Sequence, residues 1–238
     1  MLFARWGKAW LAKSMPEELF RNSGSLTHMA IYDQSHLPRE KYESSSYNKK
    51  ERFINYYHQI SEVLALKPNT VLEIGIGSGI VYHLLKKSVA DVKGLDINAA
   101  LSPDILGSVE KIPLPDQSVD VVLAAEILEH LPFKKFETSL KEIFRTAKCG
   151  AIISLPDRGA TFSLSLKIPI IPWIRGVFKI PYFWKTESMS EEHFWEIGLK
   201  GYSVHRVRAA MRSAGFTIAK EFIPHDDVYH RFFVLLKL

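Results

Sequence analysis

The stretch Val71-Leu72-Glu73-Ile74-Gly75-Ile76-Gly77-Ser78-Gly79 decides the fold of this chain. Three apolar residues and an acid lead into three glycines at alternate positions, and a mostly apolar run follows at 80–85. This order predicts a buried strand, a tight turn and the first turn of a helix. Because glycine has no Cβ, the main chain of such a turn can approach a ligand closely. The stretch therefore predicts a ligand-binding corner in an α/β domain.

The spacing of the glycines indicates which ligand the corner binds. A dinucleotide fingerprint that began at Gly75 would need glycine or alanine at position 80, where the chain has Ile80. The phosphate-binding P-loop is excluded as well, because no Gly-Lys-Ser/Thr follows. The remaining pattern, E-x-G-x-G-x-G after a strand, resembles the first motif of class I S-adenosylmethionine-dependent methyltransferases with a type 11-like domain. That resemblance implies a turn that holds the methionine moiety of the cofactor, S-adenosyl-L-methionine.

The resemblance also implies the fold class. We expect a doubly wound, Rossmann-like α/β sheet of seven strands with an antiparallel last strand, in a single methyltransferase domain over residues 1–238. A helical N-terminal extension is expected at 1–66, and an insertion at 157–190, after the fifth strand. In the extension, Trp6 and Trp10 lie near helical spacing, which favours a helix docked on the domain over a membrane-surface helix or a cofactor lid. Residues 33–48 are expected to form a loop and residues 49–66 a helix.

The composition limits the alternatives. The 238 residues carry a net charge of +5 and are 47% hydrophobic, which suits one α/β domain and does not require a nucleic-acid partner. The one cysteine, Cys149, excludes an intramolecular disulfide and a cysteine-based zinc site, and we expect it to pack at a helix end. No segment reaches the ~20 apolar residues of a membrane span, and residues 1–12 do not resemble a signal peptide. A cytoplasmic location is expected, with peripheral contact to a membrane left open.

Asp96 is a further cofactor-binding candidate. Residues 91–96 are expected to form a strand that ends in this acid, about 20 residues beyond the glycine turn. A βαβ unit brings its second strand beside the first, so the carboxylate is expected next to the turn. There it can accept hydrogen bonds from both ribose hydroxyls of a nucleoside. An ordinary strand-end acid is the alternative.

The segment 104–120, with the apolar strand 121–125 after it, resembles the adenine-side motif of the same family, G-D-A-x-x-L-P-F-x-D-x-S-F-D. It departs from the family at Ser108, which stands in place of the acid beside the adenine. A hydroxyl can still accept a hydrogen bond from the adenine amino group, and the main chain at Val109 can serve the ring nitrogens.

The motif Glu126-Ile127-Leu128-Glu129-His130 follows this strand. A helix there would put Glu126, Glu129 and His130 on one face at the carboxyl ends of the strands, where open α/β sheets bind ligands. E-x-x-E-H resembles ubiquinone-biosynthesis O-methyltransferases and small-RNA 2′-O-methyltransferases, in which it is associated with a divalent metal. Related methyltransferases carry similar residues without a metal. We therefore favour helix capping and contacts with the cofactor, and assign no metal ligand.

The rest of the chain is expected to surround the acceptor. A helix is predicted at 133–149 and a strand at 151–156. Prolines exclude a long helix at 157–190, whose apolar, aromatic and basic sequence predicts a lid for an amphiphilic or anionic acceptor, a membrane contact, or a simple cover for the core. Residues 192–202 resemble methyltransferases of surface-polysaccharide and natural-product pathways. A helix capped by Ser203 and a closing hairpin at 216–238 are expected after them.

Methyl transfer from a sulfonium is an in-line displacement, which needs a base only when the acceptor is a hydroxyl or an amine. His130 and His193 are the imidazoles expected nearest the acceptor and are the candidate catalytic residues, with a structural role as the alternative for each. The expected cofactor-binding residues are Glu73, Gly75, Gly77, Gly79, Asp96, Ile97, Ser108, Val109 and Glu126.

Three functions fit these observations. The first is a methyltransferase that uses S-adenosylmethionine and acts on a small-molecule acceptor. The basic faces expected at 134–148 and 205–212 leave open a methyltransferase of RNA or protein. The third is a non-enzymatic, membrane-associated module that keeps the fold, and the intact glycines and Asp96 argue against it. The sequence does not indicate the oligomeric state.

Overall fold

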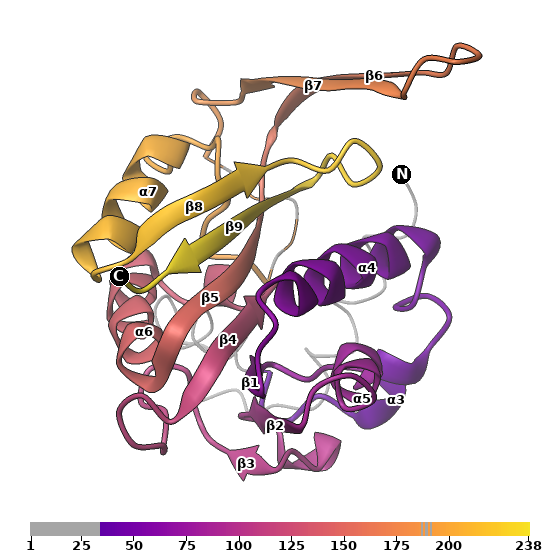
Figure 1. The fold of residues 1–238 in the computed structure, drawn as a ribbon. Helices are drawn as coiled ribbons and strands as arrows, with labels where there is room; N and C mark the ends of the chain where they lie inside the picture. Colours follow the sequence, from indigo (N-terminus) through magenta and orange to yellow (C-terminus); the bar gives the residue numbers. More distant parts are fainter. Residues whose placement is uncertain (1–33, 187, 189, 191) are drawn as a thin grey trace, which may run out of the picture. The chain divides into compact units, whose positions relative to one another are not determined.

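A seven-stranded sheet forms the centre of the described residues, which are 34–186, 188, 190 and 192–238 of a computed structural model. Its strands, in chain order, are β1 (Thr70–Ile74), β2 (Asp91–Asp96), β3 (Ile105–Leu106), β4 (Val119–Ala125), β5 (Ala147–Pro156), β8 (Thr217–Phe222) and β9 (His230–Leu236). In space the order is β3-β2-β1-β4-β5-β9-β8 (Figure 1). The pairs from β3 to β5 are parallel, and β9 is antiparallel to both of its neighbours. The predicted doubly wound sheet with an antiparallel last strand is confirmed.

Helices cover both faces of the sheet (Figure 1). On one face, α4 (Lys50–Ala65) and α5 (Ile80–Leu85) pack in a core cluster with Val71 of β1. On the other, α6 (Phe133–Thr146) and α7 (Val204–Ser213) pack in a second cluster with Leu72, the next residue of the same strand. Successive side chains of a strand point to opposite faces, so β1 is buried on both sides, as a central parallel strand should be. This burial fixes the glycine turn that follows β1.

The helix expected at 133–149 ends earlier than predicted. Ala147 is already extended, at φ −74° and ψ 141°, and begins β5. Its segment pairs with β4 on one side and with β9 on the other, so hydrogen bonding in the sheet takes priority over the amphipathic pattern. Cys149 consequently lies in a strand and is exposed, and its predicted packing role at a helix end is wrong.

The predicted N-terminal extension is described only from residue 34. The helix expected at 49–66 is confirmed as α4. Residues 33–48, expected to be a loop, include the short helix α3 (Arg39–Glu43), which buries Tyr42. The expected helix with Trp6 and Trp10 lies outside the described residues, so that extension and the single domain over 1–238 stay predictions.

The insertion at 157–190 forms a two-stranded antiparallel sheet of its own, β6 (Gly159–Leu166) and β7 (Ile174–Pro181). The expected short segments are therefore two paired strands, which leave the main sheet at the end of β5 (Figure 1). Within the part of the chain that the structure describes, no helix is both long enough and apolar enough to cross a membrane.

Candidate functional site

The glycine turn has the conformation that its sequence requires. Gly75, Gly77 and Gly79 have φ values of +78°, +49° and +73°, which residues with a Cβ adopt at a cost. A Cβ on Gly75 would lie 2.0 Å from Cδ1 of Ile127, and one on Gly77 would lie 3.4 Å from the hydroxyl of Tyr47. Gly79 is the N-cap residue of α5. The turn thus joins β1 to α5 as predicted, at the edge where the parallel strands end.

Asp96 lies beside this turn, as the βαβ argument predicted. The residue is 8% exposed, and Oδ1 accepts a hydrogen bond from the main-chain N–H of Asn98 at 2.9 Å. Burial raises the pKa of Asp96, while main-chain N–H groups of Asn98, Ile76 and Gly77 act against that rise. The carboxylate is therefore held against the glycine turn. Ile97, the next residue, is 45% exposed and can offer an apolar surface to a ligand.

Glu73 is buried within β1, next to the turn. Burial raises the pKa of Glu73 well above its usual range, and the nearby carboxylate of Asp96 adds to the rise. Among the described residues, its Oε2 has no hydrogen-bond partner. A carboxyl group that keeps its proton can donate one hydrogen bond, so Glu73 can serve a ligand from beneath the turn. Its predicted contact with the cofactor stays a prediction.

The predicted adenine-side segment also reaches this edge. The N–H of Gly107 donates to the carbonyl of Asp96 at 2.9 Å, which brings Ser108 next to β2. The Ser108 hydroxyl accepts from the N–H of Glu110 at 3.2 Å and keeps its own proton for a ligand. The side chain of Val109 is packed in the core, so this residue can serve a ligand only through its main chain.

Glu126 does not share a helix face with Glu129 and His130. It has φ +55°, and only the short 3₁₀ helix η4 (Leu128–His130) follows it. Its carboxylate accepts from the Ser154 hydroxyl at 2.7 Å and contacts Nε2 of His230 at 2.9 Å. The i, i+3, i+4 prediction is wrong here, because the residue that follows β4 is left-handed and no α-helix starts there. Whether Glu126 contacts the cofactor stays a prediction.

His230 at the start of β9 is a residue that the sequence did not indicate. Its Nδ1 lies 2.8 Å from Asp227, and its Nε2 contacts Glu126. Burial opposes the charged imidazolium, but the carboxylates of Glu126 and Asp227 outweigh it and raise the pKa of His230 to about 10. Burial would raise the pKa of Glu126, and His230 and Ser154 hold it below its usual range. This ion pair fixes the ends of β4, β5 and β9 to one another.

The raised pKa of His230 predicts how stability depends on pH. Stabilisation by a base whose pKa is raised on folding is complete below its unfolded pKa of about 6.5 and is lost as the pH rises through the folded value. The free energy of unfolding should therefore fall between pH 7 and pH 10, by on the order of 2 kcal/mol after allowance for partial exposure. In the His230→Gln variant that loss should be absent. Urea titrations at both pH values measure the free energy of unfolding. The same loss between pH 7 and pH 10 in the wild type and the variant would contradict this prediction.

His130 and His193 meet at one place, as their assignment to the acceptor region requires. Their rings lie edge to face with centroids 4.9 Å apart. Nδ1 of His130 lies 2.9 Å from the carbonyl of Glu192 and 3.1 Å from the side-chain amide of Gln34. The carbonyl can only accept, and the amide accepts as well once its oxygen and nitrogen are exchanged, so we assign the proton to Nδ1 and the lone pair to Nε2. Burial lowers the pKa of His130, and the neighbouring His193 acts in the same direction. His130 is therefore a neutral base at pH 7.

Glu129 completes a cluster with the two imidazoles. One ligand atom from each of Glu129, His130 and His193 lies within 4.8 Å of the others. Glu129 is fully buried, and burial, with the charge of Glu126 adding to it, raises its pKa well above the usual range. Neither of its carboxylate oxygens has a hydrogen-bond partner among the described residues. A proton or a bound cation can neutralise the negative charge of this buried carboxylate.

Residues 34–48, which we call the cover segment, lie over the glycine turn. Tyr47 approaches Gly77, and Tyr42 is buried in a cluster with Ile76. The cover segment is tied to the two sides of the site: Asn98 donates to the carbonyl of Leu37 at 2.8 Å, and Lys41 donates to Glu192 at 2.9 Å. Two tyrosines in an otherwise polar stretch were the only sequence signal for this role. Together the cover segment and the turn can shield a bound ligand from water.

The comparisons with known proteins agree with this geometry. The family model of the methyltransferase domain matches residues 72–155. A probable S-adenosylmethionine-dependent methyltransferase of Mycolicibacterium smegmatis (strain ATCC 700084 / mc(2)155) is 33% identical over 115 residues, which are 43% of this chain and 44% of the relative. The chain thus matches less than half the length of that curated relative.

Two solved structures share the fold. One is the 1,6-didemethyltoxoflavin-N1-methyltransferase of Burkholderia thailandensis with S-adenosylhomocysteine bound, at a TM-score of 0.56, 13% identity and 89% coverage of both chains. The other is magnesium protoporphyrin IX methyltransferase of Synechocystis PCC 6803 with S-adenosylmethionine bound, at a TM-score of 0.54, 15% identity, and 93% and 94% coverage. In the glycine turn, the strand order and the matched domain at 72–155, the chain is similar to the class I S-adenosylmethionine-dependent methyltransferases.

Proposed function

We propose that this chain transfers the methyl group of S-adenosylmethionine to a small-molecule acceptor. One observation carries the proposal: a turn with three left-handed glycines donates main-chain N–H groups of Ile76 and Gly77 to the carboxylate of Asp96, at the carboxyl edge of a parallel sheet. That edge is where open α/β sheets bind ligands. The two structural relatives named above are methyltransferases of small acceptors, a didemethyltoxoflavin and a magnesium protoporphyrin, which supports the same class of acceptor here.

For this reaction the protein mainly has to align the acceptor with the methyl group. The sulfonium of S-adenosylmethionine supplies an activated methyl group, so the protein has to hold the acceptor in line with it and exclude water. We assign part of this alignment to the glycine turn and Asp96, which would fix the cofactor. We assign the exclusion of water to the cover segment, whose Tyr42 and Tyr47 lie over the turn. Because Tyr42 is buried against Ile76 and Tyr47 approaches Gly77, we expect the cover segment to shift when the cofactor binds.

A hydroxyl or amine acceptor also has to lose a proton, and His130 is placed to take it. With the proton assigned to Nδ1, which then donates to the carbonyl of Glu192, Nε2 of His130 is left to accept. Its lowered pKa keeps it in the neutral form at pH 7, which a general base requires. His193 lies against it and is held by the carboxylate of Glu196 at 2.7 Å. We assign His193 to positioning His130.

A divalent cation at Glu129, His130 and His193 is the second candidate for activating an acceptor hydroxyl. The observation in its favour is the buried carboxylate of Glu129, which has no hydrogen-bond partner among the described residues. One carboxylate and two imidazoles suit a divalent transition metal, and such an ion would lower the pKa of a bound hydroxyl. The simpler reading is a protonated Glu129, in agreement with the direction of its pKa.

Nucleic acid is the less favoured acceptor. The basic residues at 134–148 and 205–212 suggested it, but many of these cations contact acids of the same chain, which leaves less free positive charge to bind phosphates. The ion pairs are Lys135–Glu110, Arg145–Glu142, Arg145–Asp116, Lys148–Asp120 and Arg208–Glu221.

Binding of S-adenosylhomocysteine tests the proposal, because this product occupies the cofactor site without reacting. Calorimetric titration should give micromolar affinity for the wild type. Asp96→Asn should weaken it by about 1–3 kcal/mol, or roughly 5- to 150-fold, since a charge-assisted contact to the ribose is lost. Asp91→Asn is the matched control, because Asp91 lies at the opposite end of β2 and is exposed. Equal losses in the two variants, or no binding by the wild type, would reject the proposed site.

A further inference from the structure

The β6–β7 hairpin, which we call the arm, separates polar from apolar side chains by face. Residues directly opposite in an antiparallel pair share a face, and the register pairs Phe162 with Phe178 and Leu166 with Ile174. Apart from Ala160 and Gly176, one face therefore carries large apolar side chains, all between 41% and 65% exposed. They are Phe162, Leu164, Leu166, Ile174, Phe178 and Ile180. The other face carries Thr161, Ser163, Ser165, Arg175, Val177 and Lys179.

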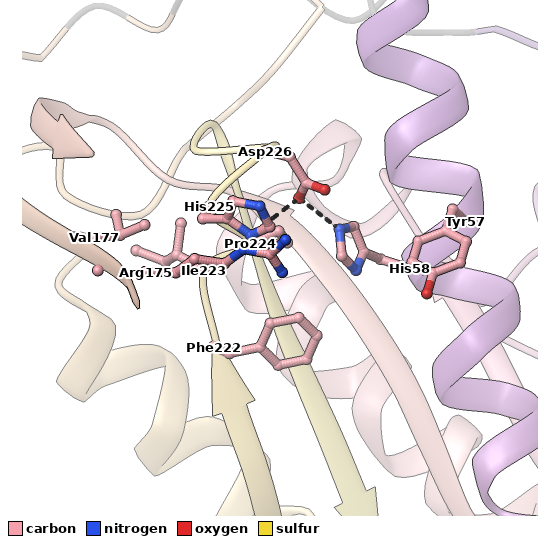
Figure 2. A pocket seen from close by; sticks show the side chains of 10 residues that line it. Tyr57, His58, Arg175, Val177, Phe222, Ile223, Pro224, His225 and Asp226 are labelled. Carbon is pink, nitrogen blue, oxygen red and sulfur yellow. Dashed lines mark hydrogen bonds and ion pairs between the residues drawn. The ribbon is translucent and has the colours of Figure 1, made fainter. Parts of the chain in front are cut away.

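The arm turns its polar face to the rest of the domain. Lys179 donates to the carbonyl of Asp157 at 2.7 Å, and Ser163 donates to the carbonyl of His225 at 3.3 Å. A cleft of about 540 Å³ separates the remainder of this face from the body, with Arg175 and Val177 on the arm side and His58, His225 and Asp226 on the other (Figure 2). An ordinary surface hairpin packs its apolar face on the core. Here the apolar face points away from it, so something outside the domain should cover that face.

The turn of the arm extends this apolar surface. Between Lys167 and Arg175 lie three isoleucines, two prolines, a tryptophan and a fourth isoleucine. Ile170 is fully exposed and Trp173 is half exposed. The guanidinium of Arg175 lies 5.0 Å from the centre of the Trp173 ring. Beyond the arm, Phe183 and Trp184 are also exposed. The apolar surface thus has an aromatic and cationic border.

The charge on the arm has one sign. No acid occurs between Asp157 and Glu187. Of the cations in this segment, Arg158 and Lys179 contact acids of the domain. For Lys167, Arg175 and Lys185 no ion pair with an acid is found among the described residues, so their charge is available to an anionic partner. Because these cations flank the apolar surface, the partner should be apolar in its interior and anionic at its border.

We propose that the arm docks this protein on an anionic lipid membrane, with its turn and apolar face inserted among the lipids. Isoleucine and phenylalanine side chains enter the acyl boundary, tryptophan prefers the interface, and lysine and arginine bind anionic headgroups. A second copy of the chain fits the arm less well, because a symmetric contact would bring its unpaired cations toward those of the partner. Peripheral docking needs no membrane-spanning helix.

Docking would also orient the proposed active site. β5 ends at Pro156, at the carboxyl edge that carries the glycine turn, and the arm begins three residues later at Gly159. A protein bound through the arm therefore presents this edge near the lipid surface. If the methyltransferase proposal holds, an amphiphilic acceptor could enter from the membrane. This last step depends on the proposed function, whereas the docking itself does not.

Vesicle flotation with the full chain tests the docking. The wild type should float with vesicles that contain about one-third phosphatidylglycerol and much less with pure phosphatidylcholine, and raising the salt should weaken binding. The double variant Ile170→Ser/Trp173→Ser should lower the partition coefficient at least about tenfold. Lys167→Gln and Arg175→Gln should each lower it roughly fivefold on the anionic vesicles.

Leu84→Ser is the matched control, because Leu84 is a 43% exposed leucine on α5, away from the arm (Figure 1). Its partition coefficient should equal that of the wild type. All variants should keep their melting temperature and their affinity for S-adenosylhomocysteine, which separates failed docking from a failed cofactor site. Unchanged binding by the double variant would overturn the proposal and point to residues 1–33. A dimer in light scattering that the double variant abolishes would overturn it in favour of a second copy.

Discussion

Gly77→Val is expected to abolish binding of S-adenosylhomocysteine while the chain stays folded. The main chain at Gly77 has φ +49°, and a Cβ there would point at the cover segment, 3.4 Å from the Tyr47 hydroxyl and 3.7 Å from the Tyr42 ring. Valine would fill the space between the turn and the cover segment, where the cofactor should lie. The left-handed conformation adds a stability cost of about 1–2 kcal/mol or more. The dissociation constant should rise more than about 100-fold, and titration calorimetry measures it.

Gly201→Val is the control that separates the effect of backbone strain from the effect of filling the cofactor site. Gly201 also has a positive φ, +86°, but a Cβ there meets no atom within 4 Å. This control should lose stability on the scale of Gly77→Val and keep the wild-type affinity. A similar loss of affinity in both variants would mean that Gly77→Val acts by unfolding. Wild-type affinity in Gly77→Val would mean that the cofactor does not bind at this turn.

The sequence was most informative where local pattern and tertiary contact agree. Glu73 to Gly79 carries a strand, a turn and a helix start in adjacent residues, and only glycine adopts the three positive φ values without cost. Asp96 followed from topology, since a βαβ unit places its second strand beside the first. These parts could be predicted because each depends on a few neighbouring residues and on one packing rule.

The sequence was least informative where a contact across the chain decides the conformation. Glu126 adopts φ +55°, and His230, more than a hundred residues later, pairs with its carboxylate, so the helical spacing of Glu126 and His130 was misleading. The cover segment is fixed by Asn98 and Glu192, neither of which is its neighbour in sequence. The arm was expected only as short segments, because its strands pair with each other and with no strand of the main sheet.

His130→Gln is expected to lower methyl transfer to a hydroxyl or amine acceptor by about 10²- to 10⁴-fold, with unchanged affinity for S-adenosylhomocysteine. The glutamine amide can still donate a hydrogen bond, as Nδ1 of His130 does to Glu192, but it cannot take up a proton. Since burial lowers the pKa of His130, the wild-type rate should rise with pH on an acidic limb below pH 6.5, and the variant should lack that limb. Labelled cofactor incubated with a cell extract measures the transfer before the acceptor is known.

Two further variants test which role His130 has in methyl transfer. His205→Gln, on the exposed side of α7, should leave the rate unchanged and controls for the loss of any histidine. His193→Gln should lower the rate less and shift the acidic limb, because His193 lies against His130 without having to accept the proton itself. If a chelator stops transfer in the wild type and Glu129→Gln does the same, the cluster acts through a bound cation. A wild-type rate in His130→Gln would mean that the acceptor needs no base, as a carboxylate would not, and would leave His130 with a structural role.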